Sequence, residues 1–329
     1  MTRPGVVRRP SLVLALGLAL TACSADAPPQ SGGSPASSTV AAPVPTAAGP
    51  TTPAPEPPRT PDATSSTLFG AAYKVTQQEP EDVALARTDE LLGRLDVVRV
   101  FNEGFPAPWP GKAPGRNVVV SFKLEPAQVT GGVHDQAMTQ WFRDAPDDLD
   151  VHWSYWHEPE DDIEDGRFTA AEYKAAFAHL QQLARDVAAP RLRSTLILQS
   201  YTTRPQSGRD WRDYYPGDEA VDVFAWDVYN RPERAAGYTP PAELMGAQVE
   251  AARSVGKPFA VAELGSVLAE GDDGSGRAQW LREVGDYLKA QDAVFVTYFD
   301  LAFNGGRDDY RLRDAASLEA WKDVTGQPS

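Results

Sequence analysis

Apolar runs of strand length recur along the chain from residue 68 onward, and the intervals between them have helical periodicity. Several of these runs are nearly continuous in Val, Ile, Phe and Trp, which is typical of parallel strands covered on both faces. The pattern predicts strands at Leu68–Tyr73, Val97–Phe101, Asn117–Phe122, Val151–His157, Arg193–Gln199, Val221–Tyr229, Phe259–Glu263 and Ala293–Phe299.

Two of the intervening segments carry clear helix boundaries. The segment Thr169–Ala188 begins with Thr169, which lies three residues before Glu172, and this spacing forms a capping box. The segment Thr239–Val255 opens with Thr-Pro-Pro and stops at Gly256, as helices commonly do. We therefore predict helices over both segments.

Eight strands that alternate with helices over about 260 residues have the size and rhythm of a (β/α)8 TIM barrel. A doubly wound sheet is the alternative, but the first strand is not followed by the glycine-rich turn of that fold. Barrel enzymes place their active sites at the carboxyl ends of the strands. The fold thus predicts where reactive side chains should occur.

The amino terminus has the organisation of an export signal. Arginines precede a short apolar run, Leu12–Leu20, which is too short to span a bilayer. The run leads into Leu20-Thr21-Ala22-Cys23, which resembles the bacterial lipobox, and Cys23 is the only cysteine of the chain. We expect residues 1–22 to be a lipoprotein signal peptide and Cys23 to carry the lipid. An ordinary secretion signal is the alternative.

The next segment differs in composition from the rest. Residues 24–66 contain 11 of the 29 prolines and no aromatic residue, whereas all eight Trp and eleven Tyr fall within residues 67–329. Such a segment buries too little apolar surface to offset chain entropy. We predict a disordered, lipid-anchored linker over 23–66 and one catalytic domain over 67–329, held on the extracytoplasmic face of the cell membrane.

The charge excludes some partners. A formal net charge of −15 repels phosphate backbones, so we expect no nucleic-acid binding. A single cysteine excludes a disulfide framework and any multi-cysteine zinc site. We expect a monomer that uses no cofactor and no metal ion, and that contacts the membrane only through the lipid on Cys23.

Two glutamates follow predicted strands at positions suited to paired chemistry. Glu158 follows the fourth strand and Glu263 ends the seventh, and these two strands face each other across the mouth of a barrel. Glycoside hydrolysis uses such a pair: one carboxyl group protonates the leaving oxygen, and the other attacks the sugar or activates water. A solvated loop position is the alternative for either glutamate alone.

The surrounding motifs point to a family. Trp156-His157-Glu158-Pro159 and Ala262-Glu263-Leu264-Gly265 resemble the acid/base and nucleophile motifs of clan A glycoside hydrolases. A histidine before the acid/base residue is typical of family 26, the β-mannanases. The stretch from Tyr215 to Asn230 is similar to that family's sixth strand. The resemblance implies a retaining mechanism in which Glu158 is the general acid/base and Glu263 is the nucleophile.

Further side chains could support this pair. His157 could bind a sugar hydroxyl, and Tyr229, on the same side of its strand as Asp227, could donate to Glu263 and keep it ionised. Arg99 could lower the pKa of the nucleophile. A purely structural role is the alternative for Asp227, Tyr229 and Arg99.

Aromatic residues are the other requirement, because sugars stack their C–H faces on rings. Trp109, Trp211, Tyr214 and Tyr215 lie in predicted loops and could line a groove or pack internally. Clan A enzymes commonly end the eighth strand with Trp, whereas here the platform is absent or supplied by Tyr298 or Phe299. In contrast, Trp141, Trp280 and Trp321 lie in helical patterns and are expected in the core.

Acidic clusters also occur at Glu160–Asp162 together with Glu164–Gly166, and at Asp272–Gly274. Carboxylates can bind calcium, but neither cluster has the spacing of a known loop, so we expect solvated loops. One further departure from family 26 is Pro159-Glu160 after the acid/base, where the family has Met-Asn.

The sequence therefore favours a surface-anchored endo-β-glycanase whose partner is a neutral polysaccharide such as β-mannan. One alternative is a non-catalytic polysaccharide-binding lipoprotein on the same barrel. Another is the solute-binding lipoprotein of an importer, which would have two lobes and a hinge.

Overall fold

The computed structural model describes residues 67–73, 79–111, 115–232, 237–303 and 306–326. The predicted signal peptide, Cys23 and the proline-rich linker lie outside these residues. None of the described helices is long and apolar enough to cross a membrane.

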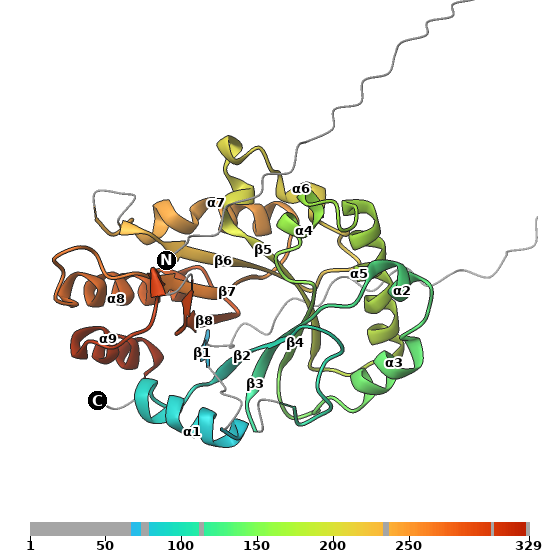
Figure 1. Ribbon diagram of the computed structural model, residues 1–329, viewed down its shortest axis with the longest axis horizontal. Helices are drawn as coiled ribbons and strands as arrows, with labels where there is room; N and C mark the ends of the chain where they lie inside the picture. The colour runs from blue at the N-terminus through green and yellow to red at the C-terminus, as the bar shows by residue number, and fades with distance from the viewer. Residues whose placement is uncertain (1–66, 74–78, 112–114, 233–236, 304–305, 327–329) are drawn as a thin grey trace, which may run out of the picture. The chain divides into compact units, whose positions relative to one another are not determined.

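Eight parallel strands form one closed barrel in chain order, and β1 pairs with β8 to close it (Figure 1). The predicted (β/α)8 fold is confirmed, and both the doubly wound sheet and the two-lobed importer fold are wrong for this domain. The strands are β1 Leu68–Ala72, β2 Val97–Asn102, β3 Asn117–Phe122, β4 Val151–Tyr155, β5 Leu192–Gln199, β6 Val223–Asn230, β7 Phe259–Ser266 and β8 Phe295–Phe299.

Helices surround the strands, as Figure 1 shows. The α-helices are α1 Glu81–Leu92, α2 Pro126–Thr130, α3 Asp135–Arg143, α4 Glu160–Glu164, α5 Ala170–Val187, α6 Trp211–Tyr214, α7 Pro241–Ser254, α8 Ser275–Ala290 and α9 Ala315–Thr325. Two short 3-10 helices, η1 Ser200–Thr203 and η2 Pro205–Ser207, follow β5, and a hairpin of β9 Ala302–Phe303 and β10 Asp308–Asp309 follows β8.

Local signals explain where the two predicted helices begin. The hydroxyl of Thr169 accepts from the Glu172 N–H at 3.2 Å, and the Glu172 carboxylate accepts from the Thr169 N–H at 2.7 Å. This reciprocal capping box starts α5 at Ala170. Helix α7 begins at Pro241, because proline at a first helical position has the required φ and lacks an N–H that would go unpaired.

The apolar core has two layers. Small and branched side chains fill the inside of the barrel, among them Ile197, Ala225, Ala260 and Ala262. A larger cluster lies between the strands and the outer helices and contains Trp141, Trp280 and Trp321, as predicted. Packing by these rings fixes the strands whose carboxyl ends carry the polar residues described next.

Candidate active site

Glu263 lies inside β7, and its orientation depends on an irregularity of that strand. Side chains alternate along a strand, so the neighbour of an inward-facing Ala262 should point outward. One extra residue on β7 breaks the alternation: Trp226 pairs with Val261, but the next residue, Asp227, pairs with Glu263. The bulge turns Glu263 toward the mouth of the barrel, beside Asp227.

Two polar groups hold the carboxylate of Glu263. The Tyr229 hydroxyl donates to Oε2 at 2.6 Å, and Arg99 Nη2 lies 3.3 Å from Oε1. Burial raises the pKa of Glu263, whereas Arg99 and Tyr229 oppose that rise by stabilising the charged form. These are the contacts that the sequence suggested for Tyr229 and Arg99.

Gly265 explains how Tyr229 reaches this carboxylate. A Cβ atom at position 265 would lie 2.8 Å from Cδ1 of Tyr229 and 2.9 Å from Cδ1 of Tyr310. Both contacts are shorter than packed carbon atoms allow, so the glycine of the Ala262–Gly265 motif leaves space for the tyrosine ring. The motif thus combines the nucleophile candidate with the space for its hydrogen-bond donor.

Glu158 lies on a strained turn after β4. Strand β4 ends at Tyr155, two residues earlier than predicted, because Trp156 and Glu158 both have positive φ, 48° and 50°. Positive φ is costly for residues with a side chain and is concentrated at functional sites. The Trp156 indole is fully buried and donates to Asp162 at 2.7 Å, which anchors one side of the turn.

The environment of Glu158 favours its protonated form. Burial, and then the negative charge of Glu263, raise the pKa of Glu158 to about 7. Asp227 lies beside Glu158, and burial and then the charges of Glu263 and Glu158 raise the pKa of Asp227 well above its ordinary value.

His157 completes the group. Its ring packs on Phe101 with centroids 5.4 Å apart, and Phe101 also lies 4.1 Å from the guanidinium carbon of Arg99. Burial and the nearby cations lower the pKa of His157 well below its ordinary value, so the imidazole is neutral. Its Nδ1 is buried and has no hydrogen-bond partner among the described residues.

The structure therefore brings together six of the residues selected from sequence, namely Arg99, His157, Glu158, Asp227, Tyr229 and Glu263. Within this set, Glu158 titrates near neutrality, while Glu263 has a cation and a hydroxyl on its carboxylate. A neutral carboxyl group beside an ionised one can give a proton and supply a nucleophile within the same site.

Three aromatic residues selected from sequence are engaged elsewhere. Trp109 stacks on Trp141 and donates to its carbonyl oxygen, and Trp211 packs against Phe224. Tyr298 is fully buried against Trp321, so the idea that it forms a sugar platform is wrong. Its hydroxyl donates to the Tyr310 carbonyl oxygen because a phenol buried among helices needs an acceptor.

The acidic clusters are not uniformly solvated. Asp273 is exposed, but Glu160 is fully buried, which corrects the expectation of a solvated loop there. Asp272 accepts backbone N–H groups of Gly274, Gly276 and Arg277 and caps the start of α8. Within the described ranges, no group of three or more His, Cys, Asp or Glu side chains is arranged to hold a metal ion.

Two residues near the site were missed from sequence. Gln199 ends β5 and its side chain hydrogen-bonds to Glu158, which lowers the pKa of that carboxyl group. The rule that drew attention to polar residues at strand ends would also have found Gln199. Phe101 could not be recognised, because a phenylalanine that ends a buried strand has no distinctive pattern.

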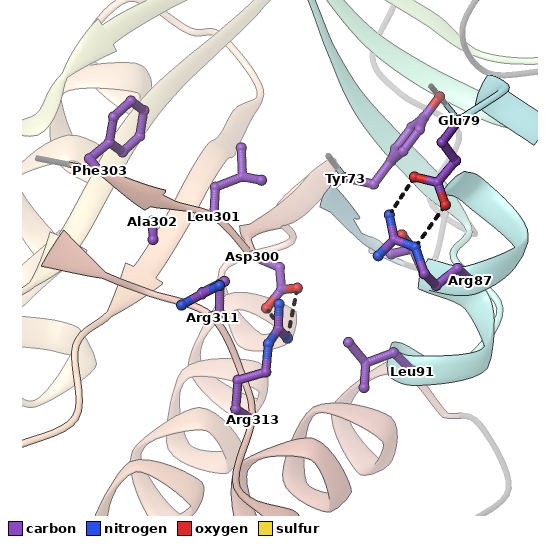
Figure 2. Close-up of a pocket in the computed structure, with 11 residues that line it drawn as sticks. Tyr73, Glu79, Arg87, Leu91, Asp300, Leu301, Ala302, Phe303, Arg311 and Arg313 are labelled. Atoms are coloured by element: carbon purple, nitrogen blue, oxygen red, sulfur yellow. Dashed lines mark hydrogen bonds and ion pairs between the residues drawn. The ribbon is translucent and has the colours of Figure 1, made fainter. Parts of the chain in front are cut away.

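A separate cavity of about 680 Å³ lies between α1 and the segment after β8 (Figure 2). Arg87 pairs with Glu79 through two hydrogen bonds of 3.0 and 3.1 Å, and Arg313 donates to both oxygens of Asp300. Phe303 stacks on Phe299 beside it, at a centroid distance of 5.1 Å. The acidic groups that line this cavity are thus paired with guanidinium groups.

Phe299 also touches the candidate active site. Its ring lies 5.8 Å from the ring of Tyr229, the donor to Glu263, and 6.4 Å from that of Phe101. Phe299 itself is only 2% exposed, whereas Phe303 is 51% exposed. Of the two, only Phe303 offers a ring to a ligand, and it does so over the cavity.

Comparisons with known proteins agree with this architecture. The chain is similar to a modular endo-β-1,4-mannanase from Cellulomonas fimi, with 18% identity, coverage of 80% of this chain and 71% of that chain, and a TM-score of 0.52. It is also similar to an endo-1,4-β-D-mannanase from Thermotoga petrophila, with 12% identity, coverage of 79% and 99%, and a TM-score of 0.51.

A third similar structure is GH26C from a Muricauda species, with 12% identity, coverage of 80% and 86%, and a TM-score of 0.52. No family model and no curated protein matches the chain. The described domain thus shares its (β/α)8 barrel fold with these three structures.

Proposed function

We propose that the chain is a retaining β-glycoside hydrolase, an endo-β-glycanase that cleaves a neutral polysaccharide such as β-mannan. One observation carries the proposal: two carboxyl groups at the barrel mouth have opposite environments. Glu158 has a pKa of about 7, while the Glu263 carboxylate is bound by Arg99 and Tyr229. This division of roles is what acid-assisted glycoside cleavage needs near neutral pH.

In the first step, Glu158 protonates the leaving glycosidic oxygen while Oε1 or Oε2 of Glu263 attacks the anomeric carbon. The C–O bond to the leaving sugar breaks, and an ester between sugar and Glu263 forms. In the second step, the ionised Glu158 takes a proton from water, which attacks the anomeric carbon and releases Glu263. Each carboxyl group thus ends in its starting protonation state.

The neighbouring groups have defined parts in this scheme. Tyr229 and Arg99 hold the Glu263 carboxylate in one orientation, and the loss of negative charge on Glu263 during the first step favours the release of the Glu158 proton. The neutral ring of His157 is partly exposed and is the group assigned to a sugar hydroxyl. The similar mannanase structures support β-mannan as the first substrate to test.

The decisive experiment is release of reducing sugars from a panel of β-mannan, glucan and xylan. Wild type is compared with Glu263→Ala and Glu158→Ala. We expect hydrolysis of at least one glycan by wild type and a loss of about 10³-fold or more in each variant. Hydrolysis that survives in Glu263→Ala would show that the nucleophile is misassigned. If wild type cleaves none of the glycans but binds one, the protein is a polysaccharide-binding lipoprotein.

Retention has its own test. A 2-deoxy-2-fluoro glycoside with a good leaving group should form a long-lived ester, because fluorine slows the second step. Mass spectrometry of peptides should then place the sugar on Glu263, and Glu263→Gln should remain unlabelled. Labelling of a different carboxylate, or rapid turnover with inverted product, would contradict the retaining mechanism.

We also propose that Cys23 carries a lipid that anchors the protein on the extracytoplasmic face of the membrane. The support is the lipobox-like sequence Leu20–Cys23 after a basic and then apolar leader. In a bacterial host, labelled palmitate should be incorporated by wild type and not by Cys23→Ala, which should be found in the medium. Equal incorporation in both would refute the anchor.

A further inference from the structure

Glu160 is a buried carboxylic acid next to the candidate acid/base, and the proposed reaction does not use it. It is the first residue of α4, two positions after Glu158, and its side chain is fully buried. A glutamate that only started a short surface helix would point to solvent, as Glu164 at the other end of α4 does. The burial of Glu160 therefore needs a reason.

The side chain of Glu160 folds back onto the end of β5. Its Oε1 accepts from the Gln199 backbone N–H at 2.7 Å. The same end of β5 holds Glu158 in two ways: the Glu158 N–H donates to the Ile197 carbonyl at 3.1 Å, and the Gln199 side chain hydrogen-bonds to the Glu158 carboxyl group. Glu160 and Glu158 are thus both hydrogen-bonded to the carboxyl-terminal part of β5.

The segment between these contacts is strained, because Trp156 and Glu158 both have positive φ. A strained turn keeps its geometry only when surrounding contacts hold it. The anchors are the Trp156 indole on Asp162 before Glu158, and Glu160 on Gln199 after it. Loss of the second anchor would free the turn to relax and move the acid group away from its proton acceptor.

We propose that Glu160 is a positioning residue, which holds the strained turn against β5 so that Glu158 is aligned for proton transfer. The inference rests on the proposed function in assigning Glu158 as the acid/base. It extends that function to a residue that departs from the family 26 pattern.

The neutral form of Glu160 suits this role. The groups that face it are Glu158 at the end of β4, Tyr173 on α5, Tyr201 on η1, Tyr214 on α6 and the cation Arg209. Burial and the charge of Glu158 raise the pKa of Glu160 to about 8, and its Oε2 has no hydrogen-bond partner in the described part of the chain. A neutral carboxyl group holds the N–H of Gln199 without placing a negative charge beside Glu158.

The variants Glu160→Gln and Glu160→Ala separate positioning from charge. Glutamine keeps an oxygen for the Gln199 N–H and is neutral at every pH, whereas alanine removes the anchor. The matched control is Asp165→Ala, at the exposed carboxyl end of α4. Activity is measured on the cleaved glycan, whose leaving group needs protonation, and on an aryl β-glycoside with a dinitrophenolate leaving group, which does not.

We expect Glu160→Ala to lose about 10- to 100-fold in kcat/KM on the glycan and less than threefold on the dinitrophenyl glycoside, because only the glycan needs the aligned acid. Glutamine should restore most of the loss on the glycan without moving the alkaline limb of the pH profile. Equal losses on both substrates would overturn the proposal, and so would an alanine variant that behaves like the Asp165→Ala control.

A second measurement does not depend on activity. The full chain with ¹³Cδ-labelled glutamate is titrated by NMR, and the Glu158 resonance is identified by its absence in Glu158→Gln. We expect the pKa of Glu158 to fall toward its ordinary value in Glu160→Ala and to stay unchanged in Glu160→Gln. An unchanged Glu158 pKa in the alanine variant would refute the positioning role, whether or not the wild type hydrolyses any glycan.

Discussion

The barrel mouth and the cavity between α1 and the β8–α9 segment both contain carboxylates and arginines, but the two regions use them differently. At the mouth, Glu158, Asp227 and Glu263 share one cation, Arg99, and burial raises all three pKa values. In the cavity, Glu79 has its own arginine, and that contact lowers its pKa. An excess of buried acid over nearby cation produces groups that titrate near neutral pH.

Stabilising the fold and catalysing a reaction thus require different arrangements of carboxylates and arginines. Exposed one-to-one pairs such as Arg87–Glu79 are satisfied and contribute little, because solvent screens them. The cluster at the mouth instead buries three carboxyl groups beside one cation.

Replacing one carboxyl group in each region should give the largest difference in kcat/KM between the two regions. We expect Glu158→Gln to lower kcat/KM on a glycan by about 10³-fold, because general acid assistance is lost. Glu79→Gln should remain within twofold of wild type. The measurement is initial rates over a range of substrate concentrations, with thermal melts to verify folding. Equal losses in the two variants would mean that the mouth has no special status.

Arg99 should matter through the pKa of Glu263. Arg99→Met removes the cation that lowers this pKa, so the acid limb of the kcat/KM profile should move to higher pH. We expect a loss of about 100-fold at neutral pH, which shrinks as the pH rises. The control is Arg313→Met in the cavity, which should leave the limb in place. A limb that does not move would exclude the electrostatic role of Arg99.

Tyr229→Phe tests a single hydrogen bond. Donation to a carboxylate contributes about 1.5–3 kcal/mol, so we expect a loss of about 10- to 100-fold in kcat with a smaller change in KM. Tyr215→Phe is the matched control, because it removes a hydroxyl that donates to the exposed Asp218 at 2.9 Å. If both variants behave alike, the Tyr229 contact has no effect on the nucleophile.

The raised pKa of Glu160 also predicts how stability depends on pH. A carboxyl group whose folded pKa is about 8 against an ordinary value of 4.5 contributes full stability below pH 4.5 and loses it as the pH rises to 8. We expect the melting temperature to fall by roughly 5–10 °C between pH 5 and 8. Glu160→Gln, which cannot ionise, should show a smaller fall. Parallel curves would indicate that Glu160 does not titrate in this range.

The smallest effect is expected in the cavity. Arg87→Gln breaks the Arg87–Glu79 pair, whose arginine side chain is 50% exposed, so the loss of unfolding free energy should be under about 1 kcal/mol. Activity should stay within twofold. A large loss of activity with unchanged stability would show that the cavity takes part in substrate binding, and the comparison between the two regions would then fail.

Much of the fold could be predicted from sequence, because parallel strands covered on both faces leave continuous apolar runs. The exact ends of the strands could not be predicted as well. The pattern placed Glu263 at the end of its strand, but β7 continues to Ser266, since β6 pairs with it as far as Asn230. Periodicity cannot reveal this extension, because it depends on the partner strand.

The six residues at the mouth could be proposed because each lies at or near the carboxyl end of a strand that the sequence marks clearly. Tyr298 and Glu160 show the limit of this reasoning. Tyr298 also lies near the end of a strand but turns toward α9, and Glu160 lies in an acidic run yet is buried. Which way such a side chain points depends on tertiary packing and backbone strain, and neither is encoded in the local pattern.

The extra residue in β7 has a consequence for how such a site could arise or be lost. If β7 kept the same residues but alternated regularly, Glu263 would face the outer helices and Leu264 the mouth. A change in the pairing of β6 with β7 would therefore abolish the reaction while every reactive side chain remained in the chain. A survey that compares only residue identities would count such a protein as an enzyme, whereas one that compares strand register would not.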